Sequence, residues 1–335
     1  MAEALVRTGR LAVVFGGAGF IGRHVVRALV KDGWRVRVAS RRPDLAFHLQ
    51  PIGKVGQIHA VQANLRYKDS IERALRNADA VVNLVGLLSE SGEQTFAAAH
   101  ADGAETVARA AKAAGVKTFV QLSAIGADAG SASAYARTKA DGEARVAAAF
   151  PGAVILRPSV VFGPEDQFFN RFATMARLMP FLPLVGGGET KLQPVFVGDV
   201  AKAAAIALNG GAKPGTVYEL GGPQVVTLRE IMEFVEDATQ HKRPLVKVGF
   251  EQASALGGVT EFLRRVSLGL LPETFVITRD QVELLRSDNV VSAQAAAEGR
   301  DLKGLGIAPE SFEAEAPAYL GRYRPTGQYA DRRAA

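Results

Sequence analysis

Three glycines spaced three residues apart, Gly16, Gly19 and Gly22, constrain the fold of this 335-residue chain more than any other feature. They follow a short apolar run at residues 11–15 and precede a segment at residues 23–31 that is rich in helix-forming residues. A short apolar run that ends in turn residues is typical of a buried parallel strand. The sequence therefore predicts a strand, a tight glycine turn and a helix, the first repeat of a parallel α/β sheet.

Five further apolar runs alternate with helical segments along the first half of the chain. The strand candidates are residues 35–39, 58–62, 80–85, 118–122 and 154–156, and the helix candidates are residues 70–76, 103–114 and 134–149. This alternation predicts an α/β fold, a doubly wound parallel (Rossmann) sheet with a smaller, mostly helical C-terminal lobe.

The alternation weakens after Pro158, where aromatic and apolar residues gather around two prolines at residues 168–184. The chain is expected to return to the sheet at residues 216–220. We predict a Rossmann domain over 8–165 and 193–222, a smaller lobe over 166–192 and 223–317, and a basic, aromatic tail over 318–335. The tail is either frayed or an arm that a partner orders.

Composition excludes several classes of protein. Cysteine is absent, which rules out disulfides, thiolate metal sites and cysteine nucleophiles. The five histidines show no metal-ligand spacing, so we expect no metal site. No apolar run approaches the ~18–20 residues that span a bilayer, and residues 1–10 lack a signal-peptide stretch. We expect a protein that is soluble or peripherally attached to a membrane.

The net charge of +6, from 40 Lys and Arg against 34 Asp and Glu, is a mild basic bias. It suits an anionic cofactor, an acidic partner or lipid headgroups. No dense basic block carries interleaved aromatic residues, so we expect no nucleic-acid ligand. Apolar residues at helical spacing over 254–271 predict a helix that faces the core or, alternatively, docks on a partner or membrane surface.

The glycine turn also indicates a ligand. A side chain at Gly16, Gly19 or Gly22 would keep a pyrophosphate away from the backbone, and the N-terminus of the next helix offers N–H donors and the positive end of its dipole. We interpret the turn as a candidate dinucleotide site. The alternative is a turn that serves only to pack the helix against the strand.

The second strand ends in Ser40, Arg41 and Arg42, at the point where an NAD site usually offers a carboxylate to the ribose. A guanidinium can hold a 2′-phosphate through two hydrogen bonds, whereas a carboxylate would repel it. We therefore predict NADP(H) as the cofactor over NAD(H). The alternative is a pair of solvated arginines in a turn.

Two other strand ends supply candidate cofactor contacts. Asn83, Val85 and Gly86 close the fourth strand, where the glycine would permit close approach of a ligand. Asn64 and Leu65 follow the third strand and would lie beside the adenine. Each group by itself is an ordinary loop, so the prediction depends on the carboxyl ends of the strands sharing one edge of the sheet.

Tyr135 and Lys139 lie four residues apart on a predicted helix, so both side chains share one face. A lysine cation favours the phenolate and lowers the pKa of a tyrosine from its usual value of about 10. Such a pair can pass a proton to or from a carbonyl, which makes both residues candidate catalytic groups. The alternative is a chance pair on a helix surface.

Taken together, the motifs resemble the extended and atypical branches of the short-chain dehydrogenase/reductase superfamily. The resemblance rests on GGAGFIG at 16–22, NLVG at 83–86, Tyr135 with Lys139, LRPSVVFGP at 156–164, QPVFVGDVA at 193–201 and LGGP at 220–223. It implies Phe20, Ile21, Ser123 and Pro158 as further cofactor contacts.

Within that superfamily the chain resembles the Rossmann-fold accessory subunits of respiratory complex I and their bacterial relatives. Five segments carry this likeness: FGPEDQFFNRF at 162–172, QPVFVGD at 193–199, TRDQVE at 278–283, DLKGLGI at 301–307 and residues 319–323. The resemblance implies a tightly held, structural NADPH and partner subunits of the peripheral arm near the membrane junction. It places the chain at the cytoplasmic face of a bacterial inner membrane or, alternatively, in the mitochondrial matrix or free cytoplasm.

One departure bears on catalysis. Active extended members carry a run of serines or threonines after the fifth strand, whereas here Ser123 is followed by Ala124 and Ile125. The resemblance implies that Ser123 is vestigial and that Ile125 replaces the catalytic hydroxyl, although Ser131 or Ser133 could supply one. The alternatives are an active reductase, epimerase or dehydratase that acts on an isoprenoid, a quinone precursor or a nucleotide sugar, and a sensor of the NADP redox state.

Overall fold

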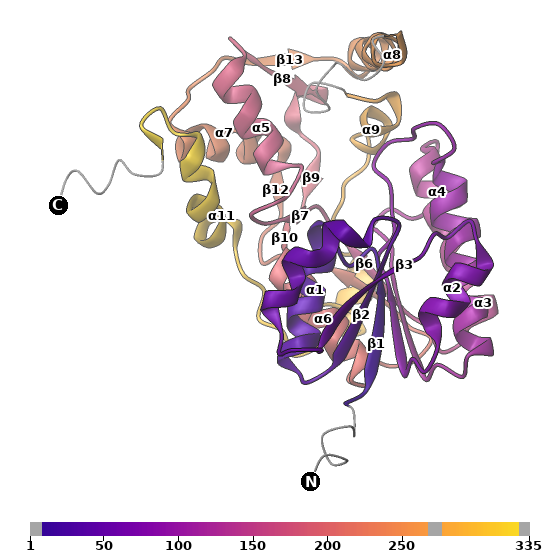
Figure 1. The fold of residues 1–335 in the computed structure, drawn as a ribbon. Coiled ribbons are helices and arrows are strands. Elements are labelled where there is room, and N and C mark those ends of the chain that lie inside the picture. The colour runs from indigo at the N-terminus through magenta and orange to yellow at the C-terminus, as the bar shows by residue number, and fades with distance from the viewer. Residues whose placement is uncertain (1–8, 267–276, 328–335) are drawn as a thin grey trace, which may run out of the picture. The chain divides into compact units, whose positions relative to one another are not determined.

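The computed structural model describes residues 9–266 and 277–327 (Figure 1). The chain divides into two compact units. The first unit comprises residues 9–158, 197–220 and 292–308, and the second comprises the described residues of 159–196, 221–291 and 309–327.

A seven-stranded parallel sheet forms the centre of the first unit. Its strands are β1 (Leu11–Phe15), β2 (Arg35–Ser40), β3 (Ile58–Gln62), β4 (Ala80–Asn83), β5 (Thr118–Leu122), β6 (Val154–Pro158) and β11 (Val217–Leu220). The strand order is β11-β6-β5-β4-β1-β2-β3. Successive strands are added on one side of β1 up to β3 and on its other side from β4 onward. This order is that of a Rossmann sheet, so the predicted fold class is confirmed.

Helices cover both faces of this sheet. They are α1 (Phe20–Lys31), α2 (Lys68–Leu75), α3 (Gly103–Ala113), α4 (Ala134–Ala149), α6 (Val197–Leu208) and the short α10 (Ala293–Ala297). Figure 1 shows α1 and α6 together on one face and α2, α3 and α4 on the other. The strands are parallel, so the loops that follow β1, β2, β4, β5 and β6 meet at one edge, where the predicted site residues lie.

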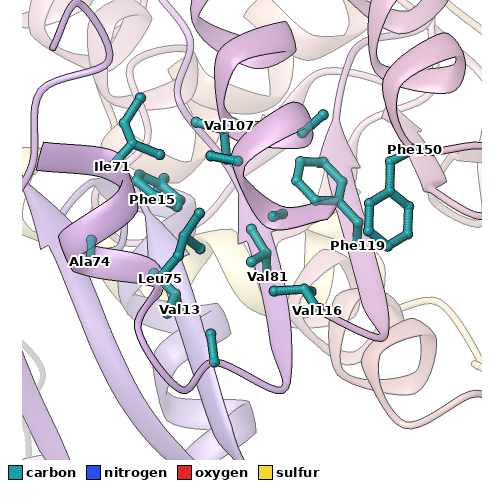
Figure 2. Close-up of a cluster of buried hydrophobic side chains, with 14 of the residues drawn as sticks. Val13, Phe15, Ile71, Ala74, Leu75, Val81, Val107, Val116, Phe119 and Phe150 are labelled. Atoms are coloured by element: carbon teal, nitrogen blue, oxygen red, sulfur yellow. The ribbon is translucent and has the colours of Figure 1, made fainter. Parts of the chain in front are cut away.

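The core between the sheet and α2, α3 and α4 is built from the inward sides of the strands (Figure 2). Phe15 from β1 and Phe119 from β5 are fully buried there, beside Ile71 and Leu75 from α2 and Val107 from α3. Burial of such side chains contributes about 1.5–3 kcal/mol each, which fixes the strand ends that carry the site.

The second unit combines helices with three two-stranded sheets. Its helices are α5 (Phe169–Leu178), α7 (Leu228–Thr239), α8 (Phe250–Val266), α9 (Arg279–Leu284) and α11 (Phe312–Leu320). Its strand pairs are β7 (Val161–Phe162) with β10 (Val195–Phe196), β9 (Lys191–Leu192) with β12 (Val226–Thr227), and β8 (Leu182–Val185) with β13 (Leu245–Val248). Phe162, Phe169, Phe234 and Phe312 pack edge to face or tilted in its core.

Two parts of the chain differ from the sequence prediction. Residues 292–308 lie with the sheet, because the Glu219 N–H donates to the Arg300 carbonyl and the Arg300 guanidinium donates to the Val217 carbonyl. The first part of the predicted tail packs in the second unit, since Tyr319 and Leu320 are buried and the Arg324 guanidinium donates to the Ala238 carbonyl. Residues 328–335 and the end of the predicted helix, residues 267–271, lie outside the described residues.

Among the residues that the structure describes, none of the helices combines the length and the apolar character needed to cross a bilayer. The same residues contain no group of three or more His, Asp or Glu side chains that could hold a metal ion.

Candidate functional site

The glycine turn follows β1 as predicted. Gly16 has φ +77°, a left-handed conformation that side chains disfavour, and a Cβ there would lie 3.3 Å from the Leu84 carbonyl carbon. The Gly19 N–H donates to the Gly16 carbonyl at 3.0 Å and closes the turn. The turn therefore requires glycine at position 16 for both its backbone angle and its surroundings.

Helix α1 begins directly on this turn. A Cβ on Gly22 would lie 2.3 Å from the Gly16 oxygen, so only glycine allows the helix to approach so closely. No described side chain caps Gly19, and the first turn of α1 carries no acidic residue. The N–H groups at Phe20 and Ile21 and the positive end of the dipole are thus left for an anionic ligand.

The two arginines after β2 differ in their contacts. The Arg42 guanidinium pairs with Asp44 at 2.8 Å, which raises the pKa of Arg42 and lowers that of Asp44. Ser40 Oγ accepts from the Arg42 N–H, so it shapes the same turn. Arg41 is exposed and has no side-chain hydrogen bond or ion pair to any described residue. Of the two arginines, Arg41 is thus the one without a competing carboxylate among the described residues.

The residues at the ends of β3 and β4 have internal partners. Asn83 is fully buried, its Nδ2 donates to Gln121 Oε1 at 2.9 Å, and its Oδ1 accepts from the Val85 N–H. Asn64 donates its N–H to Ser70 Oγ, and Leu65 lies against Gly103. Asn83 and Asn64 therefore shape the two loops at the sheet edge through their own hydrogen bonds.

Lys139 and Gly86 approach each other, although they are far apart in the sequence. A Cβ on Gly86 would lie 3.3 Å from Lys139 Nζ, and this Nζ lies 5.7 Å from the centre of the Tyr135 ring. Lys139 is buried and makes no hydrogen bond or ion pair with the described residues. Burial lowers the pKa of Lys139 to about 8, with Glu143 opposing the shift. The predicted Tyr135–Lys139 pair is thus assembled beside Gly86.

His100 is a site residue that the sequence did not predict, because the five histidines were considered only as metal ligands. It lies on a π-helical turn at Ala97–Asp102 and is only 2% exposed. Its ring is 5.2 Å from the Tyr135 ring at an interplanar angle of 85°. Burial, with a smaller effect of the Lys139 cation, lowers the pKa of His100 to about 3, so the ring is neutral at physiological pH.

Ser123 directly follows β5 and has an unsatisfied hydroxyl. Its Oγ is buried and has no hydrogen-bond partner among the described residues. Two residues on, Ile125 presents a buried aliphatic side chain, and its N–H donates to the Pro158 carbonyl at the end of β6. A buried hydroxyl without a partner costs stability, so this position is one that a bound ligand could satisfy.

The two other serine candidates are used by helix α4. Ser133 Oγ accepts from the Ala136 N–H and caps the helix, and Ser131 Oγ accepts from the Ser133 N–H. Both hydroxyl oxygens are thus held at the helix N-terminus. These contacts position the start of the helix that carries Tyr135 and Lys139.

The residues present at this sheet edge fit a dinucleotide. The Gly16–Gly22 cradle admits a diphosphate, Arg41 is available to a further phosphate, and Ser123 offers an orphaned hydroxyl near the end of β5. The Tyr135–Lys139 pair provides a proton donor beside an amine whose pKa is lowered. The arrangement can therefore bind a dinucleotide and exchange a proton.

Comparison with known proteins shows the family to which the chain belongs. The family model of the NAD dependent epimerase/dehydratase family matches residues 12–221. NADH dehydrogenase (ubiquinone) 1 alpha subcomplex subunit 9 of Arabidopsis thaliana is 35% identical over 96% of this chain and 79% of that protein. Ceramide reductase of Caulobacter vibrioides is 34% identical over 57% of this chain and 58% of that protein.

Among solved structures, the NADPH-dependent quinone oxidoreductase QOR2 of Escherichia coli, complexed with NADPH, has a TM-score of 0.70 and 21% identity. It covers 92% of this chain and 99% of that one, a likeness that shows the fold. The family match includes the glycine turn, Ser123, Tyr135 and Lys139. The chain belongs to the NAD dependent epimerase/dehydratase family, and its relatives include alpha subcomplex subunit 9 of mitochondrial NADH dehydrogenase.

Proposed function

We propose that this chain is an accessory subunit of a respiratory complex I and that it holds NADP(H) as a structural cofactor. The observation that carries the proposal is the 35% identity to NADH dehydrogenase alpha subcomplex subunit 9, because it extends over 96% of the chain and so includes both units. Bound cofactor stabilises the folded state by mass action, which suits a structural role.

The choice of NADP(H) rests on Arg41, which is exposed and unpaired among the described residues, whereas Arg42 is held by Asp44. We expect Arg41→Ala to raise the Kd for NADPH by roughly tenfold and to leave the Kd for NADH unchanged, since a charge-assisted pair is lost. Arg42→Ala is the matched control and should change either Kd less. Fluorescence titration with both nucleotides measures this; equal affinities that Arg41→Ala does not alter would contradict the assignment.

The residues after β5 support a cofactor that is retained and not turned over. A nicotinamide dinucleotide, when bound, supplies a hydride to a carbonyl or accepts one from an alcohol. Tyr135 would give or take the proton at its hydroxyl, and Lys139 would favour the phenolate. Ile125 offers no hydroxyl to polarise a carbonyl, and the hydroxyl oxygens of Ser131 and Ser133 accept from backbone N–H groups at the start of α4. Loss of such a donor costs on the order of a hundredfold in rate.

The proposed partners are subunits of the peripheral arm near its junction with the membrane arm. We place the chain at the cytoplasmic face of a bacterial inner membrane, attached peripherally, with lipid headgroups as further contacts that its +6 net charge would favour. The relatives that are NADH dehydrogenase subunits are mitochondrial. They support membership of such a complex, and we propose the bacterial membrane in place of the mitochondrial one.

The test is co-migration in native membranes. The chain would carry a C-terminal tag, the membranes would be solubilised in mild detergent, and a native gel would be stained for NADH:quinone oxidoreductase activity. We expect the tagged chain in the active band, and we expect Tyr135→Phe to leave that activity near normal. Migration as a small species without respiratory subunits would contradict the proposal.

A second candidate function is supported by the intact Tyr135–Lys139 pair and by the partial likeness to ceramide reductase. In this case the chain is an NADP-dependent reductase, epimerase or dehydratase, acting on an isoprenoid, a quinone precursor or a nucleotide sugar. Tyr135→Phe separates the two functions, because it should abolish turnover in the enzyme and leave complex activity intact in the subunit.

A further inference from the structure

His100 joins two elements that carry the candidate site. Its Nε2 lies 3.0 Å from the backbone nitrogen of Leu87, in the loop that follows β4 and contains Gly86. Its Nδ1 lies 3.1 Å from Oγ1 of Thr138, on helix α4 between Tyr135 and Lys139. Both ring nitrogens of one buried histidine are therefore used, each by a different element.

The partners determine which nitrogen carries the proton. A backbone N–H can only donate, so Nε2 must accept from Leu87. Thr138 Oγ1 donates its own hydrogen to the Tyr135 carbonyl at 3.0 Å, so this oxygen accepts from an Nδ1–H. The ring is thus the neutral Nδ1–H tautomer, and a second proton on Nε2 would face the Leu87 N–H.

The surroundings hold the ring in one orientation. Phe96 stacks on it at 5.4 Å with an interplanar angle of 16°, and Tyr135 packs edge to face on it. A Cβ on Gly142 would lie 1.9 Å from the His100 carbonyl oxygen, so α4 rests directly on the π-helical turn only because residue 142 is glycine. The two hydrogen bonds of the His100 ring, to Leu87 and to Thr138, thus form a bridge between the loop after β4 and α4, and packing holds this ring in place.

We propose that His100 is a positioning residue that fixes the Gly86–Leu87 backbone against the helix that carries Tyr135 and Lys139. This inference rests on the proposed function, because a cofactor at the sheet edge is what the positioned backbone would contact. Histidine suits the role since its flat ring stacks between aromatic neighbours while it accepts on one side and donates on the other.

Two variants test the bridge. His100→Phe keeps a ring that can stack but removes both hydrogen bonds, and His100→Gln keeps an oxygen that can accept from Leu87. The matched control is His59→Phe, because His59 is exposed on β3. The first measurement is amide hydrogen exchange at Leu87 in the cofactor-free chain, and the second is NADPH affinity.

In His100→Phe we expect Leu87 exchange to rise by roughly tenfold or more and the Kd for NADPH to rise by roughly tenfold, the effect of one lost hydrogen bond. His100→Gln should recover part of both changes, which a purely structural defect would not allow, and it carries the test if the phenylalanine variant does not fold. His59→Phe should match the wild type.

Unchanged Leu87 exchange in both variants would show that no bridge exists. Faster exchange with an unchanged Kd for NADPH would show that the bridge does not serve the site. A wild-type chain that binds no NADPH would contradict the proposed function and, with it, any role of His100 at a cofactor site, whereas the exchange measurement would still report the bridge itself.

Discussion

Each of the two units buries polar side chains, but a larger share of their hydrogen-bonding groups has internal partners in the second unit than in the first. In the first unit, Ser123 Oγ has no partner and Lys139 has no hydrogen bond or ion pair among the described residues. In the second unit, Asp166 is equally buried but accepts from the N–H groups of Gly163, Phe168 and Asn170 and from the Tyr319 hydroxyl.

Polar groups without internal partners are expected in a binding site, whereas fully hydrogen-bonded groups are expected where they only stabilise the fold. The Asp166 cluster joins the loop before α5 to the C-terminal helix α11, and Arg322 extends it with a hydrogen bond to Asn170. Its carboxylate is already saturated by these internal donors. The Ser123 and Lys139 groups retain unused hydrogen-bonding capacity at a cost in stability, which is expected where a ligand completes the structure.

The largest effect should come from Gly142→Ala. Because the new Cβ would lie 1.9 Å from the His100 carbonyl oxygen, α4 must move away from the π-helical turn and separate the site residues. We expect a loss of about 3 kcal/mol in the free energy of unfolding, despite the better helix propensity of alanine. Chemical denaturation measures this.

Gly130→Ala is the matched control for that variant. A Cβ on Gly130 would meet nothing closer than Asp128 Oδ1 at 3.6 Å, and its φ is not left-handed. We expect this substitution to be neutral within error and to leave NADPH binding intact. If Gly142→Ala were equally neutral, the close packing that supports His100 would be refuted.

The next effect is on acid stability. The pKa of His100 is lowered to about 3, so between pH 6.5 and 3 the unfolded chain binds a proton that the folded chain does not. This contribution is present above pH 6.5 and is lost on acidification. Relative to His100→Gln, the wild type should lose about 3 kcal/mol of stability from pH 6.5 to 4. Parallel pH profiles for the two proteins would contradict the buried neutral ring.

A second effect, also a rise of stability with pH but in the alkaline range, is expected for Lys139. Its pKa is lowered to about 8, so above pH 8 the folded chain releases a proton that the unfolded chain keeps until about pH 10.5. The stability of the cofactor-free wild type should rise by about 2 kcal/mol from pH 8 to 10 relative to Lys139→Met. Denaturation at both pH values tests this. If the difference in unfolding free energy between the two proteins were the same at pH 8 and pH 10, the lowered pKa of Lys139 would be contradicted.

The smallest effect should come from the Asp166 cluster. Tyr319→Phe removes one of four hydrogen bonds to the carboxylate, so we expect a loss of about 1 kcal/mol in stability with no change in NADPH affinity. Tyr67→Phe, at an exposed residue, serves as the control. A loss of NADPH affinity in Tyr319→Phe would contradict the claim that the hydrogen bonds of Asp166 serve the fold and not the binding site.

The sequence predicts the first unit well because its signals are local. Three of the predicted strands, at residues 11–15, 58–62 and 118–122, match the observed bounds, since buried runs end at clear turn residues. The helix at 134–149 also matches, and Ser133 supplies its cap. The short strands of the second unit carry no comparable period, because two-residue pairs are set by tertiary contacts.

In the candidate site, likewise, local sequence signals predict some residues, whereas others depend on tertiary contacts. The glycine turn and the Tyr135–Lys139 pair can be predicted from their spacing together with the strands and helices that the sequence indicates around them. His100 could not be, because its role depends on Leu87 and Thr138, which are brought to it by the packing of α4. The inequality of Arg41 and Arg42 likewise arises from Asp44, a contact that spacing does not reveal.

The measurement that tests the central claim most directly is calorimetric titration of the purified full-length chain with NADPH, together with its melting temperature. The account predicts one NADPH per chain and a higher Tm, since ligand at a hundred times its Kd adds about 2.7 kcal/mol to stability. A folded chain that binds no NADPH and shows no shift in Tm would contradict the claim that Ser123 and Lys139, the buried groups of the first unit without hydrogen-bond partners among the described residues, belong to a cofactor site.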